Sequence, residues 1–279
     1  MIPKEEYEFA EINSPSEVTR NIACRKPRNA YFYALLIDKE PRDDTRNAAC
    51  KDPEYAYKYA ENIDKEPRDD TRKAACKDPK YAQNYAEYID KEPRDDTRKA
   101  ACEDSNSAYY YAYFTDKEPR DDTRKAACED PEDAYFYAKD IDKGPHKITR
   151  KAVCKNIDLA LVYAKTIDNG PSNETRKAAC ADLRSAYLYV IEIDKCSHED
   201  TRKAACKNSK YAYWYAYKID KKPREDTREA ACRSPEYAYY YALNVDKEFH
   251  QETWKAVKNT EFEEKYKDLF NQIGKSKII

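Results

Sequence analysis

Small and apolar residues recur along the chain at helical spacings, in short runs separated by turn residues. Between residues 67 and 92, one run places Thr71, Ala74 and Ala75 at i, i+3 and i+4. A second run follows the i, i+3, i+4, i+7 pattern: Ala82, Tyr85, Ala86 and Ile89. Asp78-Pro79 lies between the runs and suits an N-cap followed by proline at the first helical position. The pattern predicts two short antiparallel helices.

Proline and acidic residues predict where these helices begin and end. We expect Pro67 in the first turn of the first helix, where Asp69 and Asp70 also face the positive end of the helix dipole. The second helix is expected to end near Asp90-Lys91, before Pro93. Helices this short are marginal alone, so stacking on neighbours must stabilise them.

The same pattern returns every 26 residues without insertion or deletion. A Thr-Arg pair marks the period at Thr19, Thr45, Thr71, Thr97, Thr123, Thr149, Thr175, Thr201 and Thr227, and Thr253-Trp254 keeps it. Such a period is typical of a solenoid. We therefore predict an all-α solenoid of about ten 26-residue, two-helix repeats over residues 15–250. Capping helices are expected at residues 1–14 and within residues 251–279, the latter an amphipathic helix with Phe262, Tyr266, Leu269, Phe270 and Ile273 on its apolar face.

Two nearly invariant rows are expected to form the core. One is alanine: Ala30, Ala56, Ala82, Ala108, Ala134, Ala160, Ala186, Ala212 and Ala238. The other is tyrosine: Tyr33, Tyr59, Tyr85, Tyr111, Tyr137, Tyr163, Tyr189, Tyr215 and Tyr241. Small residues allow close helix approach, and one ring per layer fills the remaining space.

Two short strings carry a family resemblance: Ala74-Ala75-Cys76-Lys77 and Ala82-Gln83-Asn84-Tyr85-Ala86. Their spacing resembles the HEAT-like α-hairpin solenoids, and within them an uncharacterised family of short alanine- and tyrosine-rich helical repeats. The sequence departs where Pro79-Lys80 replaces a glycine-containing turn. The resemblance implies a binding protein whose second helices line a concave surface, and it names no ligand.

Composition narrows the classes of function. Lys and Arg number 52 against 54 Asp and Glu, so bulk attraction to nucleic acid or an anionic membrane is not expected. No apolar run is long enough to span a membrane, and Met1-Ile2-Pro3-Lys4 does not suggest a signal peptide. Nine of the ten cysteines occupy one repeat position, where packed helices lie too far apart for disulfides. We expect a soluble, cytoplasmic protein in a reducing compartment, with Cys196 alone as an exposed thiol.

Catalytic and cofactor chemistry has little support. His146, His198 and His250 occupy a position that is elsewhere arginine, which suggests surface substituents rather than general bases. Three glycines in the whole chain cannot build a phosphate-binding loop. We therefore expect no enzyme activity, no cofactor and no metal.

A row of arginines has two interpretations. Arg72 and its equivalents could track phosphates, with Lys73 and its equivalents beside them. Alternatively they could pair with the aspartates that end every second helix, such as Asp90, in ion pairs that link each repeat to its neighbour.

The most informative departure from the repeat lies on the second helices, opposite their core positions. Three positions there, those of Lys58, Glu61 and Asn62, are often apolar or aromatic in other repeats. A solvated face should be polar, so we interpret these side chains as anchors for a partner; the alternative is that they pack on the next repeat. The candidate anchors are Phe32, Leu35, Leu36, Tyr88, Tyr110, Tyr113, Phe114, Phe136, Leu188, Trp214, Tyr217, Tyr240 and Leu243.

These observations predict a non-enzymatic protein-binding module, an adaptor or an inhibitor. The near-identity of the second to fifth repeats adds the hypothesis of a phage- or parasite-encoded protein that diversifies quickly. A single-stranded nucleic-acid-binding protein is the alternative, with bases stacked on the aromatic rings and phosphates on the arginine and lysine rows. A structural spacer is the third.

Overall fold

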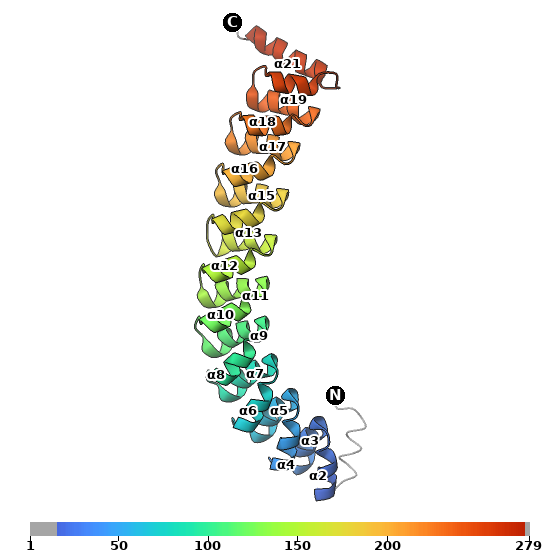
Figure 1. Ribbon diagram of the computed structural model, residues 1–279, viewed down its shortest axis with the longest axis vertical. Helices are drawn as coiled ribbons and strands as arrows, with labels where there is room; N and C mark the ends of the chain where they lie inside the picture. The colour runs from blue at the N-terminus through green and yellow to red at the C-terminus, as the bar shows by residue number, and fades with distance from the viewer. Residues whose placement is uncertain (1–15, 277–279) are drawn as a thin grey trace. The chain divides into compact units, whose positions relative to one another are not determined.

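The computed structural model describes residues 16–276, with side chains as far as residue 271. Within this range every element is helical and no β-strand occurs, so the predicted all-α solenoid is confirmed (Figure 1). The predicted cap helix at residues 1–14 lies outside the described residues. The first helices of the repeats are α2 Glu17–Ala23, α4 Asp43–Ala49, α6 Asp69–Ala75, α8 Asp95–Ala101, α10 Asp121–Ala127, α12 Lys147–Val153, α14 Asn173–Ala179, α16 Glu199–Ala205, α18 Glu225–Ala231 and α20 Gln251–Val257.

The second helices complete the hairpins, and α21 follows the last first helix, α20. Their bounds are α3 Pro27–Tyr33, α5 Pro53–Tyr59, α7 Pro79–Tyr85, α9 Ser105–Tyr110, α11 Pro131–Phe136, α13 Ile157–Thr166, α15 Leu183–Tyr189, α17 Ser209–Tyr215, α19 Pro235–Tyr241 and α21 Glu263–Ser276. Most second helices continue into a π-helical turn. These turns are η1 Ala34–Asp38, η2 Ala60–Asp64, η3 Ala86–Asp90, η4 Tyr111–Asp116, η5 Tyr137–Asp142, η6 Val190–Asp194, η7 Ala216–Asp220 and η8 Ala242–Asp246.

The π-turn ends each of these second helices in the same way. In the third repeat the N–H of Lys91 donates to the carbonyl of Ala86 at 2.9 Å, five residues back. Lys91 itself takes a left-handed conformation with φ of 56°. The wider turn carries Asp90 to the last helical position, and the left-handed residue then reverses the chain toward the next repeat.

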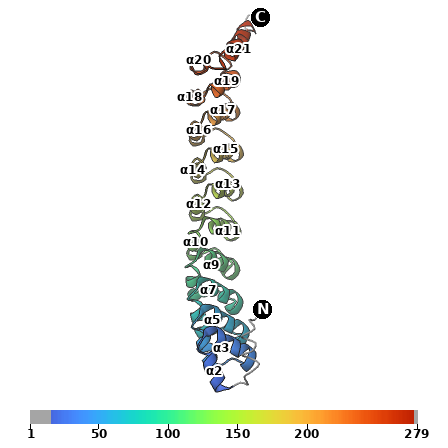
Figure 2. The same ribbon diagram turned by 90° about the vertical axis from the view of Figure 1, so that its right-hand side faces the viewer.

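Contacts divide the chain into two compact parts, an N-terminal half (Met1–Thr149) and a C-terminal half (Arg150–Ile279). In the C-terminal half, α14, α16, α18 and α20 form one row, and α13, α15, α17 and α19 form another (Figure 2). Each second helix therefore has second helices as its neighbours along the row. This arrangement gives the half a face made of second helices alone.

The prediction for the start of a second helix is confirmed at α7, whereas the prediction for the start of a first helix is wrong at α6. Asp78 caps α7 by accepting the N–H groups of Lys80 and Tyr81, and Pro79 is the first helical residue, as predicted. The predicted place of Pro67 in the first turn is wrong, because α6 begins at Asp69 with Arg68 as its extended N-cap. The backbone N–H of Arg68 donates to the hydroxyl of Tyr85, and this tertiary contact holds the N-cap outside the helix.

The core is the predicted stack of alanines and tyrosines. Ala75, Tyr85 and Ile89 pack in one cluster with Tyr57 and Ala60 of the preceding repeat. Nearly all residues of both predicted rows are buried. Because alanine keeps the helices close, each tyrosine ring fills its layer almost completely.

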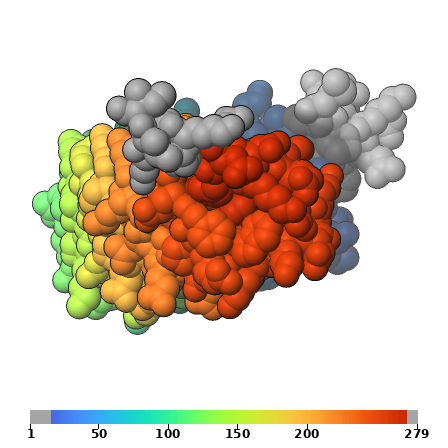
Figure 3. All heavy atoms as spheres, turned by 90° about the horizontal axis from the view of Figure 1, so that it is seen from above, coloured from blue at the N-terminus to red at the C-terminus, as the bar shows by residue number. Residues whose placement is uncertain are grey.

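The C-terminal cap helix α21 takes the place of a second helix beside α20. Tyr266 of α21 takes the place of the core tyrosine, and its hydroxyl oxygen lies 2.8 Å from Oγ1 of Thr253. Trp254, where other repeats have arginine, packs on the Tyr266 ring with centroids 5.6 Å apart. Figure 3 looks onto this end, where atoms of the C-terminal helices, in red, face the viewer. The predicted cap helix is thus present, from Glu263 to Ser276.

Candidate functional site

A buried polar contact holds the two helices of each repeat together beneath the candidate surface. The hydroxyl of Tyr85 accepts the N–H of Arg68 at 2.9 Å and donates to the carbonyl of the same residue at 3.1 Å. Oγ1 of Thr71 lies 2.9 Å from this hydroxyl. Burial raises the pKa of Tyr85, so it remains a neutral phenol. The contact fixes the rotation of the second helix, and with it the direction of the helix's outer side chains.

The arginine row is paired within each repeat. Nε and Nη2 of Arg72 donate to the carboxylate of Asp90, with Nη2 2.8 Å from Oδ1, and the guanidinium lies 5.6 Å from the centre of the Tyr85 ring. Its Nη1 donates to Asp69 at 2.6 Å. The bond to Asp90 raises the pKa of the arginine, which stays charged. Arg72 and Asp90 are buried, so this guanidinium does not serve as an exposed phosphate contact.

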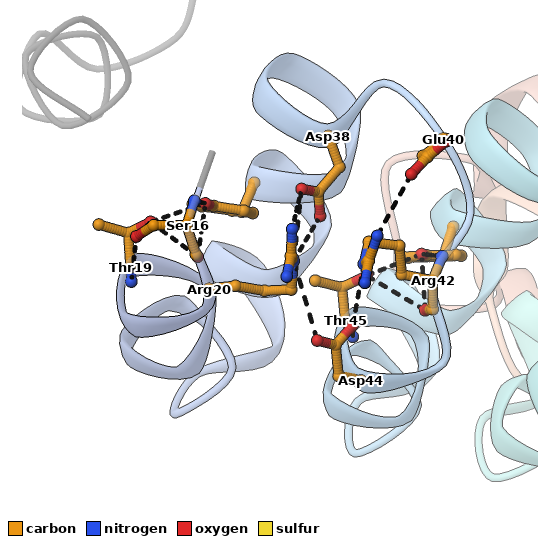
Figure 4. Close-up of polar contacts among 10 residues, drawn as sticks. Ser16, Thr19, Arg20, Asp38, Glu40, Arg42, Asp44 and Thr45 are labelled. Carbon is orange, nitrogen blue, oxygen red and sulfur yellow. Dashed lines mark hydrogen bonds and ion pairs between the residues drawn. The ribbon is translucent and has the colours of Figure 1, made fainter. Parts of the chain in front are cut away.

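Pairing within a repeat corrects the expectation that these ion pairs link neighbouring repeats. Arg72 is on the first helix, and Asp90 ends the second helix of the same hairpin, because the π-turn brings the aspartate back beside α6. In the first repeat, Nη2 of Arg20 lies 2.7 Å from Oδ1 of Asp38 in the same hairpin. Its Nε lies 3.8 Å from Oδ2 of Asp44, which belongs to the next repeat (Figure 4).

One repeat departs from this arrangement. Nε of Arg202 donates to Asp226 of the next repeat at 2.8 Å, and its Nη1 donates to Ser197. The expected partner, Asp220, keeps both carboxylate oxygens buried without a hydrogen-bond partner among the described residues. The sequence gives no sign of this change, since Arg202 and Asp220 both match the repeat.

The candidate anchors of the N-terminal half lie on the outer side of its second helices. Tyr88, Tyr110, Tyr113, Phe114 and Phe136 are exposed. Phe32, Leu35 and Leu36 are half-buried, and Phe32 and Leu35 pack against the core cluster around Tyr59.

Four of these side chains form one group, which we call the first aromatic patch: Tyr110, Tyr113, Phe114 and Phe136. The rings of Tyr110 and Phe114 stack with centroids 5.9 Å apart, and Tyr113 meets Phe114 edge-on at 4.8 Å. Phe136 joins them through Tyr109, whose ring lies 6.1 Å from Phe136 and 5.0 Å from Tyr110. The structure therefore brings residues of two repeats into one continuous aromatic surface.

The C-terminal half carries a second aromatic patch, made of Trp214, Tyr217 and Tyr240. Trp214 and Tyr217 are exposed, whereas Tyr240 is half-buried. Tyr213 connects the two tyrosines: its ring stacks on Tyr217 with centroids 5.8 Å apart and lies 5.9 Å from Tyr240. The ring of Trp214 contacts Tyr187 of the preceding repeat at 6.1 Å. The remaining candidates are half-buried: Leu188 lies in α15 and Leu243 in η8.

A row of tyrosines beneath both patches was missed by the sequence analysis. Tyr57, Tyr109, Tyr187 and Tyr213 lie two positions before a core tyrosine, and their rings bridge to the next repeat, as Tyr57 does to Tyr81 at 6.1 Å. This neighbouring row packs on the adjacent repeat, as the alternative interpretation expected of the candidate anchors. Three candidate anchors take part in the same contacts: Phe136 with Tyr109, Trp214 with Tyr187 and Tyr240 with Tyr213. The recurring Tyr-x-Tyr pattern was the signal that could have found it.

The residues considered for catalysis have structural roles. Nδ1 of His198 accepts the N–H of Asp200, and Nδ1 of His250 accepts that of Glu252, so both cap helices. Burial raises the pKa of Cys76 and Cys102 to about 11, which keeps these thiols protonated. Within residues 16–276, no cluster of three metal-ligating side chains occurs, and no helix has the length and apolar character needed to cross a membrane.

No family model, curated protein or solved structure matches the chain. The repeated helical hairpin of about 26 residues is therefore supported by the structure described above.

Proposed function

We propose that this protein is a non-enzymatic protein-binding module, an adaptor or an inhibitor, that docks its partner on the first and second aromatic patches. The observation that carries the proposal is the clustering of exposed rings on the second helices, above all the direct contacts of Tyr110, Phe114 and Tyr113. Large aromatic side chains that cluster on a surface are the usual anchors of protein interfaces.

Preorganisation supports the same proposal. The ring of Tyr109 packs against Phe136, and that of Tyr213 stacks on Tyr217. The hydroxyl of Tyr109 also donates a hydrogen bond to Asp140 at 3.0 Å. Side chains already fixed in place lose little conformational entropy when a partner binds. A rigid scaffold with variable outer rings is suited to recognising one partner.

The nucleic-acid alternative has less support than the sequence suggested. Its phosphate contacts were expected from the arginine and lysine rows, and Arg72, Arg98 and their paired equivalents are engaged with aspartates instead. The lysines of the first helices remain exposed, but they lie on the first helix of each hairpin, whereas the rings lie on the second.

Two finer inferences accompany the proposal. We infer that the hairpins belong with the HEAT-like solenoids, on the resemblance of their alanine and tyrosine spacing. We also infer a reducing, cytoplasmic location, since all ten cysteines are free thiols, and the pKa of several half-buried ones is raised.

Site-specific photocrosslinking tests the proposal. p-Benzoylphenylalanine replaces Phe136 or Tyr217 in the full chain, and it replaces the exposed Lys99 of a first helix as the matched control. The variants are irradiated in nuclease-treated lysate, and crosslinked species are identified by mass spectrometry. We expect one protein to crosslink from the patches but not from Lys99.

A second comparison uses the triple variant Phe136→Ala, Trp214→Ala, Tyr217→Ala, with unchanged helicity by circular dichroism. Loss of the crosslinked protein from pull-downs with this variant, but not with Lys73→Ser, Lys99→Ser, Lys125→Ser, supports the proposal. Equal retention by all variants contradicts it. Salt-sensitive retention of RNA or single-stranded DNA in place of a protein would favour the alternative.

A further inference from the structure

A groove in the C-terminal half adjoins the second aromatic patch. Its volume is about 640 Å³, within the range of pockets that hold a ligand or a large side chain. It lies along η6 and η7 and the chain that follows η6. The lining residues are Tyr187, Val190, Ile191, Lys195, Cys196, Ser197, Lys218, Ile219 and Lys221.

The floor of the groove is apolar. Ile191 is 42% exposed, although Val190 beside it is fully buried. Val190 occupies a position that is alanine in the other repeats, and its larger side chain is buried beside the groove. The ring of Tyr187 lies 6.1 Å from Trp214, so the floor is continuous with the second aromatic patch.

The rim of the groove is basic. Among the side chains described, those of residues 16–271, no ion pair involves Lys195, Lys218 or Lys221. The ammonium group of Lys218 lies 4.7 Å from the centre of the Tyr217 ring. The nearby acids are engaged elsewhere. Asp194 pairs with Arg176 at 2.7 Å, and Glu192 pairs with Lys165 at 3.0 Å. Both carboxylate oxygens of Asp220 are buried without a hydrogen-bond partner among the described residues, so they are not exposed at the rim.

The sequence of the turns explains why the positive charge accumulates here. In the first four repeats, the left-handed lysine is followed by glutamate, as in Lys65-Glu66 and Lys91-Glu92. At the groove, the corresponding pairs are Lys195-Cys196 and Lys221-Lys222. The acidic neighbour is therefore missing at both turns that border the groove.

We propose that this groove binds an acidic segment of the partner protein, with a large aliphatic side chain on the floor and carboxylates at the three lysines. The inference rests on the proposed function and names the chemistry of its partner. Charge complementarity selects the acidic segment, because burying a partner's cations against Lys195, Lys218 and Lys221 would be unfavourable. The aliphatic side chains of Ile191 and Ile219 favour a leucine-like side chain over a nucleic-acid base, which would require a stacking ring. The ring that lines the groove, Tyr187, already packs edge-on against Tyr211 and Trp214.

Cys196 provides a chemical handle for the test because it is the exposed cysteine at the groove. Short peptides carry one cysteine as a mixed disulfide with β-mercaptoethanol. The Cys196 thiolate attacks the peptide's sulfur and releases β-mercaptoethanol as the thiol. Intact-mass spectrometry then measures how much free β-mercaptoethanol displaces half of the bound peptide.

Three peptides are compared on the full-length protein: alternating glutamate–leucine, glutamine–leucine and glutamate–serine. We expect the glutamate–leucine peptide to withstand about tenfold more reductant than either of the others, a difference of about 1.4 kcal/mol. The double variant Lys218→Gln, Lys221→Gln should remove its advantage over the glutamine–leucine peptide. Lys177→Gln, which removes an exposed lysine from a first helix of the same half, should leave that advantage intact.

Equal retention of the three peptides, or an advantage that survives the double variant, overturns the proposal. So does stronger retention of a thiol-modified oligothymidylate than of the glutamate–leucine peptide. These outcomes are distinct from failure of the proposed function. A partner could still crosslink at Phe136 and Tyr217 while Cys196 shows no preference, in which case the patches bind protein and the groove does not.

Discussion

The hydroxyl oxygens of Tyr85 and Thr71 lie 2.9 Å apart in the core of the third repeat. The same pair of residue types recurs through the described chain, for example between Tyr137 and Thr123 at 3.0 Å and between Tyr241 and Thr227 at 2.9 Å. Each tyrosine also accepts the N–H of the residue that caps the first helix, as Tyr85 does for Arg68. One phenol therefore joins the first helix, its N-cap and the second helix.

Tyr85→Phe should destabilise the protein by about 1–3 kcal/mol, because Arg68 and Thr71 lose a buried hydrogen-bond partner. Thr71→Val should cost less, since Tyr85 keeps its bonds to the backbone. Urea unfolding measures both, and hydrogen exchange at the Arg68 amide should accelerate in Tyr85→Phe. Tyr110→Phe, which removes an exposed hydroxyl, is the control; an equal loss there would contradict the role assigned to the buried phenol.

Asp90→Asn should cost about 3 kcal/mol, because it leaves the buried guanidinium of Arg72 with a weaker partner. Asp220→Asn changes the same repeat position but removes no hydrogen bond, since the oxygens of Asp220 have none. We expect Asp220→Asn to change stability by about 0.5 kcal/mol or less. Thermal and urea unfolding measure the stability of both variants. An equal loss of stability in Asp90→Asn and Asp220→Asn would show that Arg202 pairs with Asp220 in solution.

Stability should fall as the pH rises from about 9 to 11. Burial raises the pKa of Cys76 and Cys102 from 9.0 to about 11. Below pH 9 both states are protonated; between the two pKa values, the unfolded state releases protons that the folded state keeps, so alkali favours unfolding. Each such thiol contributes a slope of up to about 1.4 kcal/mol per pH unit.

Urea midpoints across this pH range measure the slope. Cys76→Ala, Cys102→Ala should flatten it, and Cys196→Ala, which removes an exposed thiol, is the control. A slope unchanged in the double variant would assign the alkaline transition to other groups, such as the buried tyrosines.

Lys65→Gly should stabilise the protein by up to about 1 kcal/mol. Lys65 has φ of 59°, a left-handed conformation that is unfavourable for any residue with a side chain, and glycine relieves this cost while losing some entropy on folding. Lys73→Gly, inside α6, should instead cost about 1 kcal/mol. Denaturant midpoints of both variants test the pair, and destabilisation by Lys65→Gly would be the contrary result.

Much of the fold followed from the sequence because it depends on local and repeated features. Asp78-Pro79 predicted the start of α7 through capping, which needs only neighbouring residues. The alanine and tyrosine rows predicted the core because an identical pattern in every repeat must face the same way in every layer. The exposed rings, including Tyr113 and Trp214, followed from the same helical phase.

Tertiary structure decided which side chains meet. The π-turn directs Asp90 back to Arg72 of its own repeat, and Tyr85 holds Arg68 outside α6, so Pro67 precedes the helix instead of starting it. Arg202 takes a different partner although its sequence position is unchanged. The repeat pattern determines which residues share a face, through helical geometry alone. Pairing across the hairpin, and the groove at Ile191, depend on how each second helix ends and where the next repeat packs.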